Sequence, residues 1–225
     1  MDQEVVGNYK KRRILAVFAH PDDETSVGPL LAKCAGEGHA VYLVSFTSGE
    51  RGAAHTDIPP GEQLGSIREG ELRCAAECLG IHQPFLFRFQ DQSMCGAVVM
   101  EKAAERLRAL IDETRPDVLI TFGPGGVTGH PDHVAASEIT TQAFQQQGLL
   151  EHKPKKLYYV AFPESRLQGV PDPLEPSRFL HMVSDCFITT EIDCRAFLEK
   201  GYAAVRCHKT QFPPEWIAWL REMFS

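Results

Sequence analysis

Short apolar segments alternate along this chain with segments of helical periodicity, and this alternation restricts the fold more than any other feature. The apolar segments cover residues 13–20, 40–47, 85–89 and 117–122. They run as continuous apolar stretches, so each predicts a strand that is buried on both faces of a sheet. Between them lie stretches such as 64–79, where an apolar residue recurs every three or four positions, and these predict helices.

The same patterns set the bounds of the expected elements. Helices are predicted at 29–36, 63–79, 98–113, 134–147, 193–207 and 215–224, and two further strands at 156–161 and 186–190. Pro29 suits a first helical turn, and Gly80 and Gly148 each follow a last turn. A regular succession of strands and helices predicts an α/β fold, namely a Rossmann-like doubly wound sandwich with a mostly parallel sheet, formed as one domain over residues 1–225.

The charge and the hydropathy pattern exclude several classes of protein. The chain has 23 Lys and Arg against 30 Asp and Glu, a net charge of −7, whereas nucleic-acid-binding domains usually carry a basic excess. No apolar run approaches the ~20 residues of a membrane-spanning helix, and residues 1–9 lack the apolar segment of a signal peptide. We therefore expect a cytoplasmic protein without a nucleic-acid partner or a membrane span.

The cysteines give no sign of a disulfide framework. There are seven, an odd number, and none form a Cys-x-x-Cys pair. Cys34, Cys74, Cys78 and Cys207 lie within apolar helical patterns, so we expect them to be reduced, buried and hydrophobic in character, and not to be paired or bound to zinc. A chain of this length can bury a large core without a structural metal, so a bound metal would serve chemistry.

Two clusters of metal-binding residue types follow predicted strands. Residues 19–24 (AHPDDE) come directly after the first strand, and residues 129–133 (GHPDH) come after the fourth. Ligands in doubly wound sheets bind beyond the carboxyl ends of the strands. Alone, the first cluster also fits a solvated turn or a helix N-cap. Together, the two clusters offer imidazole and carboxylate donors, which suit zinc or another divalent first-row metal.

These motifs make the chain resemble the PIG-L/LmbE-like family of zinc-dependent N-deacetylases, which act on N-acetylglucosamine-type groups in sugar conjugates. The resemblance covers nearly the whole chain. Besides the two clusters, it includes TSGERG at 47–52, the pair Arg68 and Glu69, and Lys200 followed by HKTQ at 208–211. It implies a hydrolase that holds one divalent ion, Zn²⁺, in each chain.

The resemblance also implies a role for each residue of the two clusters. His20, Asp23 and His133 would be the metal ligands. Asp22 would be the general base that takes a proton from the attacking water, and His130 would be the acid or electrostatic partner. Some relatives place a tyrosine near the second cluster, but this chain has the shorter Thr128 there, so His130 is expected to stabilise more of the oxyanion.

Three more residues are candidates for substrate binding, and each has a structural alternative. Arg68 shares a predicted helix face with apolar residues, so it either contacts the substrate, as the resemblance implies, or extends to solvent. Asp91 follows the third strand and either bonds sugar hydroxyls or completes a turn. His208 lies on an apolar helical face, where it either supports the site or is a core residue.

The function expected from this resemblance is removal of an N-acyl group, with acetyl as the first choice, from an N-acetylglucosamine-type sugar conjugate. Two alternatives remain open: an amidase or deacylase that acts on another amide, such as a thiol conjugate or a glycosylated antibiotic, and a non-catalytic sugar-binding domain. The expected partner is a small amino-sugar conjugate, and assembly with other copies of the chain is left open. The loops at 50–61 and 163–178, which are rich in Pro and Gly, are expected to select the substrate.

Overall fold

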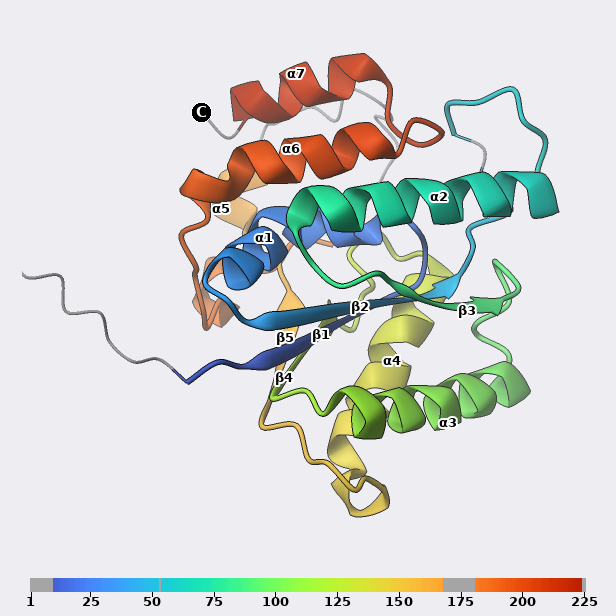
Figure 1. Cartoon of the computed structure of the whole chain (residues 1–225), viewed down its shortest axis with the longest axis vertical. Coiled ribbons are helices and arrows are strands. Elements are labelled where there is room, and N and C mark those ends of the chain that lie inside the picture. Colours follow the sequence, from blue (N-terminus) through green and yellow to red (C-terminus); the bar gives the residue numbers. More distant parts are fainter. Residues whose placement is uncertain (1–9, 53, 168–180, 224–225) are drawn as a thin grey trace, which may run out of the picture.

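A parallel five-stranded sheet organises the computed structural model, which describes residues 10–52, 54–167 and 181–223 (Figure 1). The strand order is β3-β2-β1-β4-β5. The strands are β1 Arg13–Phe18, β2 Ala40–Thr47, β3 Phe85–Phe89, β4 Val118–Phe122 and β5 Lys156–Val160. Every neighbouring pair is parallel. The chain winds from β1 to β3 on one side and then returns through β4 to β5 on the other, so the predicted doubly wound fold is confirmed.

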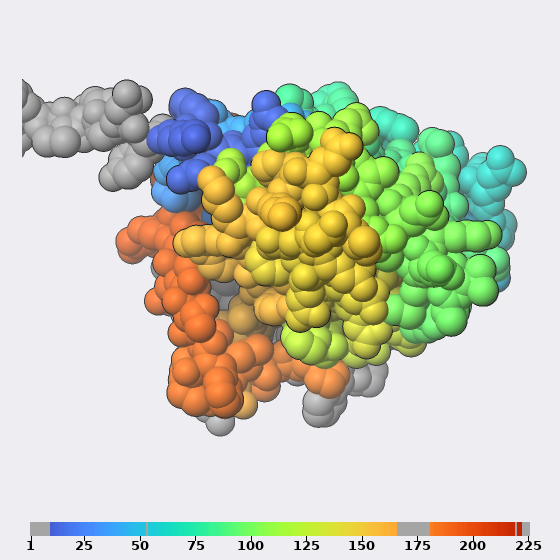
Figure 2. All heavy atoms as spheres, turned by 90° about the horizontal axis from the view of Figure 1, so that it is seen from below, coloured from blue at the N-terminus to red at the C-terminus, as the bar shows by residue number. Residues whose placement is uncertain are grey.

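Helices cover both faces of the sheet (Figure 1). One face carries α1 (Gly28–Gly36), α2 (Glu62–Leu79) and α6 (Leu198–Cys207), with α7 (Pro214–Met223) outside α6; the other carries α3 (Ala97–Thr114) and α4 (Pro131–Gln145). Figure 2 shows this second side, where green α3 lies beside yellow α4. The short helices are η1 Asp23–Val27, η2 Gln147–Leu149, α5 Glu164–Leu167, η3 Asp185–Phe187 and η4 Arg195–Phe197. Within the described ranges, no helix combines the length and the apolarity that crossing a bilayer requires.

The central strand β1 shows why these strands are continuously apolar in sequence. Leu15 and Val17 pack into the core beneath α3 and α4, whereas Ala16 and Phe18 pack into the core beneath α1, α2 and α6. All four residues are at most 1% exposed. Successive side chains of a strand point to opposite faces, and both faces are covered, so no position of β1 after the exposed Arg13 is free to be polar.

The strand predicted at 186–190 is wrong. The chain there forms η3 and then continues without regular structure. Phe187 in this segment is 73% exposed, so the segment is not buried as an inner strand would be. Among the described residues, the pairing nearby is an isolated bridge between Pro163 and Val183. A run of five residues is too short for periodicity to distinguish a buried strand from a surface segment.

The expectation that Cys74 and Cys207 are reduced and unpaired is also wrong. Cys74 and Cys207 form a disulfide that joins α2 to α6 across 133 residues of sequence. Cys34, Cys78, Cys95, Cys186 and Cys194 are free. Cys74 is exposed, because it lies at the edge of the apolar face of α2. The pairing arises from the packing of two helices that lie far apart in the chain, and local spacing carries no information about it.

Candidate active site

The carboxyl ends of β1 and β4 bring the two predicted clusters together. β1 leads directly to His20 and η1, and β4 leads through a glycine-rich loop to His130 and α4. The two strands are neighbours in the sheet, with Ala16 paired to Ile120. The order of strands reverses at this point, which is the usual position of a ligand in a doubly wound sheet.

Three donor groups from these clusters converge on one point. His20 Nδ1 lies 3.1 Å from His133 Nε2. Asp23 lies between the rings, with Oδ1 3.2 Å from His133 Nε2 and Oδ2 3.6 Å from His20 Nδ1. Ligands that bind a tetrahedral zinc ion at about 2.0–2.1 Å stand roughly 3.3 Å from each other. The three separations therefore fit a single small divalent cation.

Hydrogen bonds on the far side of each imidazole leave the converging nitrogens available. His133 Nδ1 bonds the carbonyl oxygen of Gly126 at 3.0 Å, which leaves the lone pair on Nε2. His20 Nε2 faces Asp91 Oδ1 at 3.1 Å and Asp132 Oδ2 at 3.4 Å, which leaves the lone pair on Nδ1. Partners of this kind fix the tautomer and the ring orientation of metal-binding histidines.

Asp132 is a functional residue that the sequence analysis missed. It is fully buried, and its carboxylate accepts backbone N–H bonds from Gln92 at 2.6 Å and Met94 at 3.0 Å. It therefore anchors the loop after β3, which carries Asp91, while it also orients His20. With Asp91 and His20 it is close enough to form a second donor group, but its oxygens are already occupied by backbone donors. The signal in the sequence was an acid between the two histidines of the GHPDH motif.

The acids and imidazoles of the cluster shift each other's pKa values. Burial favours the neutral acid of Asp23, but the charge of His133 holds the pKa of Asp23 well below its usual range. Burial also favours a neutral His20, but its bonds to Asp132, Asp23 and Asp91 raise the pKa of His20 well above its usual value. Against the effect of burial, the bond from His20 lowers the pKa of Asp91 to about 2. Asp23 and Asp91 are thus ionised on either side of the His20 ring.

Asp22 takes a different partner from Asp23. Its φ angle is 112°, which is strained for a residue with a side chain. This turn directs the carboxylate toward Arg68, with Oδ1 3.3 Å from Nη2, and leaves 20% of the side chain exposed. Burial raises the pKa of Asp22, against the effect of the Arg68 charge. The structure thus separates the two adjacent aspartates, as predicted, although their roles remain a proposal.

Arg68 is buried and does not extend to solvent. It is 3% exposed and donates to the carbonyl oxygens of Pro21 and Gly49, both at 2.6 Å. Gly49 has a φ angle of 63°, and a Cβ there would collide with the guanidinium group. Arg68 therefore joins the loops after β1 and β2 and positions Asp22. A direct contact between Arg68 and the substrate stays a prediction.

His130 is the N-cap of α4 and offers a hydrogen-bond donor. Its Nδ1 accepts a bond from the backbone N–H of Asp132 at 3.2 Å, so the neutral ring carries its proton on Nε2. The ring lies edge-on to His20, with centroids 4.8 Å apart. Burial, together with the charges of His20 and His133, lowers the pKa of His130. The N-terminus of a helix also favours negative charge, so the position suits a developing oxyanion.

The hydroxyl group of Thr128 contacts both His130 and His133. Its Oγ1 lies 3.3 Å from His133 Nδ1, and it accepts a bond from the backbone N–H of His130 at 3.4 Å. The hydroxyl group therefore belongs to the scaffold of the second cluster. The role of His130 at the oxyanion stays a prediction.

His208 is fully buried behind the site. Its Nε2 lies 2.6 Å from Oε1 of Glu24, which is also fully buried. The other oxygen of Glu24 accepts the backbone N–H of Asp22 at 3.0 Å. His208 therefore supports the turn that carries Asp22, and its predicted contact with substrate is not part of this geometry. Glu24 was present in the predicted motif, but its supporting role depends on a partner 184 residues away.

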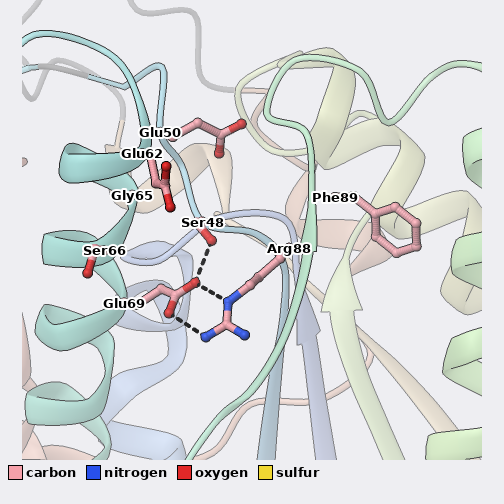
Figure 3. Close-up of a pocket in the computed structure, with 8 residues that line it drawn as sticks. All are labelled: Ser48, Glu50, Glu62, Gly65, Ser66, Glu69, Arg88 and Phe89. Atoms are coloured by element: carbon pink, nitrogen blue, oxygen red, sulfur yellow. Dashed lines mark hydrogen bonds and ion pairs between the residues drawn. The ribbon is translucent and has the colours of Figure 1, made fainter.

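A cavity of about 450 Å³ adjoins the site at the ends of β2 and β3 (Figure 3). It is lined by Ser48, Glu50, Glu62, Gly65, Ser66, Glu69, Arg88 and Phe89. Glu69 and Arg88 form a two-bond pair across it, at 2.7 and 2.9 Å. Glu50 accepts the backbone N–H of Asp91 at 2.8 Å, which connects the cavity with the surroundings of His20. The predicted loop at 50–61 borders this cavity, whereas residues 168–178 of the second loop lie outside the described residues.

Known proteins share both the sequence pattern and the fold of this chain. The family model described as GlcNAc-PI de-N-acetylase (PIG-L) matches residues 15–144. A 1D-myo-inositol 2-acetamido-2-deoxy-alpha-D-glucopyranoside deacetylase of Thermobifida fusca (strain YX) is 37% identical, over 89% of this chain and 83% of its own. A protein of the same description from Rhodococcus jostii (strain RHA1) is 33% identical, over 89% and 82%.

A solved structure supports the fold. The N,N'-diacetylchitobiose deacetylase from Pyrococcus horikoshii superposes with a TM-score of 0.69 and 20% identity, over 94% of this chain and 75% of its own. At that identity the likeness is evidence for the fold alone. The family model and the more similar relatives confirm the prediction of a deacetylase, and the chain belongs to the GlcNAc-PI de-N-acetylase (PIG-L) family.

Proposed function

We propose that this protein is a zinc-dependent hydrolase that removes the acetyl group from an N-acetylglucosamine-type conjugate. The observation that carries the proposal is the convergence of His20, Asp23 and His133, with Asp22 left unligated beside them and His130 offering a proton donor. Its family membership and a deacetylase relative that is 37% identical support the same reaction. One ion in each chain is the stoichiometry that three ligands imply.

Each residue of the site has its own part in the proposed hydrolysis of the amide. A divalent ion held by His20, Asp23 and His133 would lower the pKa of a bound water to about 7 and polarise the acetyl carbonyl. Asp22, held by Arg68, takes the proton from the water as its oxygen bonds the carbonyl carbon. His130 donates its Nε2–H toward the carbonyl oxygen as negative charge develops there. The carbon–nitrogen bond then breaks, the amine leaves with a proton supplied by the protein, and acetate remains.

The cavity beside the site supports a polar conjugate as the substrate. Glu50, Glu62 and Ser66 line it and present oxygen atoms suited to sugar or polyol hydroxyl groups. We infer that the acetylated ring binds at the three donors while the remainder of the conjugate extends toward this cavity. The relative from Thermobifida fusca is named for a substrate of this chemical class, a glucosaminide of inositol. The proposed substrate is therefore a small amino-sugar conjugate, which the protein would meet in the cytoplasm.

A deacetylation screen with metal analysis tests the proposal. Purified protein is incubated with glycosides of N-acetylglucosamine, among them an inositol glycoside, and with unrelated amides, and the free amine is measured. We expect amine release from the glucosaminides and about one zinc per chain. The variant His133→Ala should lose most of its metal and activity, because one of three ligands is removed, whereas the exposed His82→Ala serves as the matched control.

Two results would count against the proposal. Full metal retention in His133→Ala would remove this residue from the ligand set. Cleavage of unrelated amides without any cleavage of glucosaminides would refute the substrate class while leaving the hydrolytic machinery intact.

A further inference from the structure

Three cysteines gather where α2 packs against the end of α6. Cys74 and Cys78 are one turn apart on α2, so they share a helix face. Cys207, the last residue of α6, is bonded to Cys74, with their Cα atoms 5.8 Å apart. Cys78 Sγ lies 3.8 Å from Cys207 Sγ. The cluster therefore consists of a disulfide and a third sulfur in van der Waals contact with it.

The three sulfurs differ in their access to solvent. Cys74 is exposed, Cys78 is half-buried, and Cys207 is 8% exposed. A thiol reagent from solution therefore meets Cys74 first, whereas Cys78 is the thiol best placed to reach Cys207 from within the protein. A disulfide that only fastens two helices together needs no third thiol at this distance.

We infer that Cys74, Cys78 and Cys207 form a thiol–disulfide exchange site, in which Cys207 bonds either Cys74 or Cys78. In the exchange, Cys78 gives up its proton and its sulfur bonds Cys207 Sγ. The Cys74–Cys207 bond breaks, and Cys74 leaves as a thiolate that takes up a proton, so no oxidant or reductant is consumed. A dithiol reductant from solution reduces the disulfide. The dithiol is oxidised to a disulfide, and its two electrons and two protons pass to Cys74 and Cys207.

The cluster is connected to the catalytic loops through the residues that follow Cys207. His208 bonds Glu24, and Glu24 in turn holds the backbone N–H of Asp22. The bond that Cys207 makes therefore fixes the start of a segment that supports the turn of the general base. Reduction of the disulfide should loosen this support and lower kcat, while KM changes little because the cavity residues that α2 provides, Glu62 to Glu69, lie in its first half, before Cys74. This consequence rests on the proposed function, whereas the exchange chemistry does not.

Peptide mapping after differential alkylation tests the exchange directly. The whole protein is equilibrated in a mildly oxidising glutathione buffer, and its thiols are trapped at low pH. We expect a Cys74–Cys207 pair in the wild type and in Cys78→Ser, and a Cys78–Cys207 pair in Cys74→Ser. If Cys78 and Cys207 both remain free in Cys74→Ser, exchange between the two partners does not occur and the inference is overturned. Cys186→Ser, which alters an exposed cysteine outside the cluster, is the matched control.

The kinetic arm tests the link to the site. The wild type reduced by a dithiol should show a several-fold lower kcat than the oxidised wild type, at nearly constant KM. Cys207→Ser should show the same kcat with and without the dithiol, and Cys186→Ser should respond as the wild type does. Equal kcat in the two redox states of the wild type would overturn the link. The peptide map needs no activity, so it tests the exchange even if the proposed function fails.

Discussion

At the scale of single residues, the two adjacent aspartates illustrate how one turn creates two chemical roles. Asp23 accepts backbone N–H bonds from Ala19 and His20, at 3.1 and 2.8 Å, so its carboxylate is fixed beside the histidine donors. Asp22 adopts its positive φ angle and is held instead by Arg68. The two carboxylates therefore take different partners, which suits the proposed pair of a metal ligand and a free base.

The variants Asp22→Asn and Asp23→Asn should separate these roles. Asp22→Asn should keep its metal, because no ligand is removed, while kcat falls by roughly 10²–10⁴-fold, the usual effect of losing a positioned acid–base group. Asp23→Asn should bind metal more weakly, and excess metal should restore part of its activity. Metal content by mass spectrometry and steady-state kinetics measure both effects. Metal loss in Asp22→Asn combined with retention in Asp23→Asn would show that the roles are reversed.

At the scale of elements, the segment after α6 fastens the C-terminal helices to the catalytic loops. Thr210 donates from its backbone N–H and its hydroxyl to Glu71 of α2, at 2.9 and 2.6 Å. Gln211 donates to the carbonyl oxygen of Gly52 at 2.7 Å, in the loop after β2. Together with the bond between His208 and Glu24, these contacts join the HKTQ segment to the loops that follow β1 and β2.

The variant His208→Gln should have a lower free energy of unfolding than the wild type, and the difference should be largest below neutral pH. Burial disfavours the imidazolium of His208, but the charge of Glu24 and the bond to it raise the pKa of His208 above its ordinary value of 6.5. A raised pKa in the folded state stabilises the fold fully below the pKa of the unfolded chain, and this contribution is lost as pH rises through the folded pKa. The wild type should therefore exceed His208→Gln most at about pH 5.5, by about 1–3 kcal/mol.

Urea unfolding from pH 5 to pH 9 measures this difference in the free energy of unfolding. The exposed His82→Gln is the matched control, because it removes a histidine that is outside the segment. If the difference in the free energy of unfolding between wild type and His208→Gln grows as pH rises, His208 is not an imidazolium beside Glu24 in the folded protein.

At the scale of the whole molecule, the candidate metal site connects two halves of the sheet. His20 and Asp23 follow β1, which leads into the half formed with β2 and β3, whereas His133 lies on α4, which follows β4. The hydrophobic cores on the two faces extend across both halves. A cation held by these three residues would therefore link segments that are distant in sequence, and it would bind the folded chain in preference to the unfolded chain.

Metal loading should raise the melting temperature accordingly. Ligand at 100 times its Kd stabilises a folded protein by about 2.7 kcal/mol, and for a chain of this size that corresponds to roughly 5–11 °C. Thermal unfolding of chelator-treated protein, with and without zinc, measures the shift. Asp22→Asn should show nearly the same increase, because it retains the ligands, and Asp23→Asn a smaller one. An equal increase in Asp23→Asn and the wild type would argue that the stabilising ion binds elsewhere.

Local sequence patterns predicted most of the elements and the family, although not the chain at 186–190. The strands β1 to β5 and the helices lie close to their predicted positions, because a strand buried on both faces must be apolar throughout and a surface helix must repeat every 3.6 residues. α4 begins at Pro131, three residues before its predicted start, because His130 caps it. The motifs at 19–24 and 129–133 identified the metal-binding residue types, since each motif is local. Formation of one domain over 1–225 stays a prediction.

Which residues meet across the molecule depended instead on how the whole chain packs. The partner of Glu24 is His208, Arg68 binds the loops after two different strands, Asp132 holds the loop after a third, and Cys74 pairs with Cys207. Each of these contacts joins segments that are distant in the chain, and each depends on the depth at which a side chain is buried. The periodicity of a sequence reports which face of an element is apolar. It does not report which element covers that face, and for this reason the supporting residues of the site emerged only from the packing of the fold.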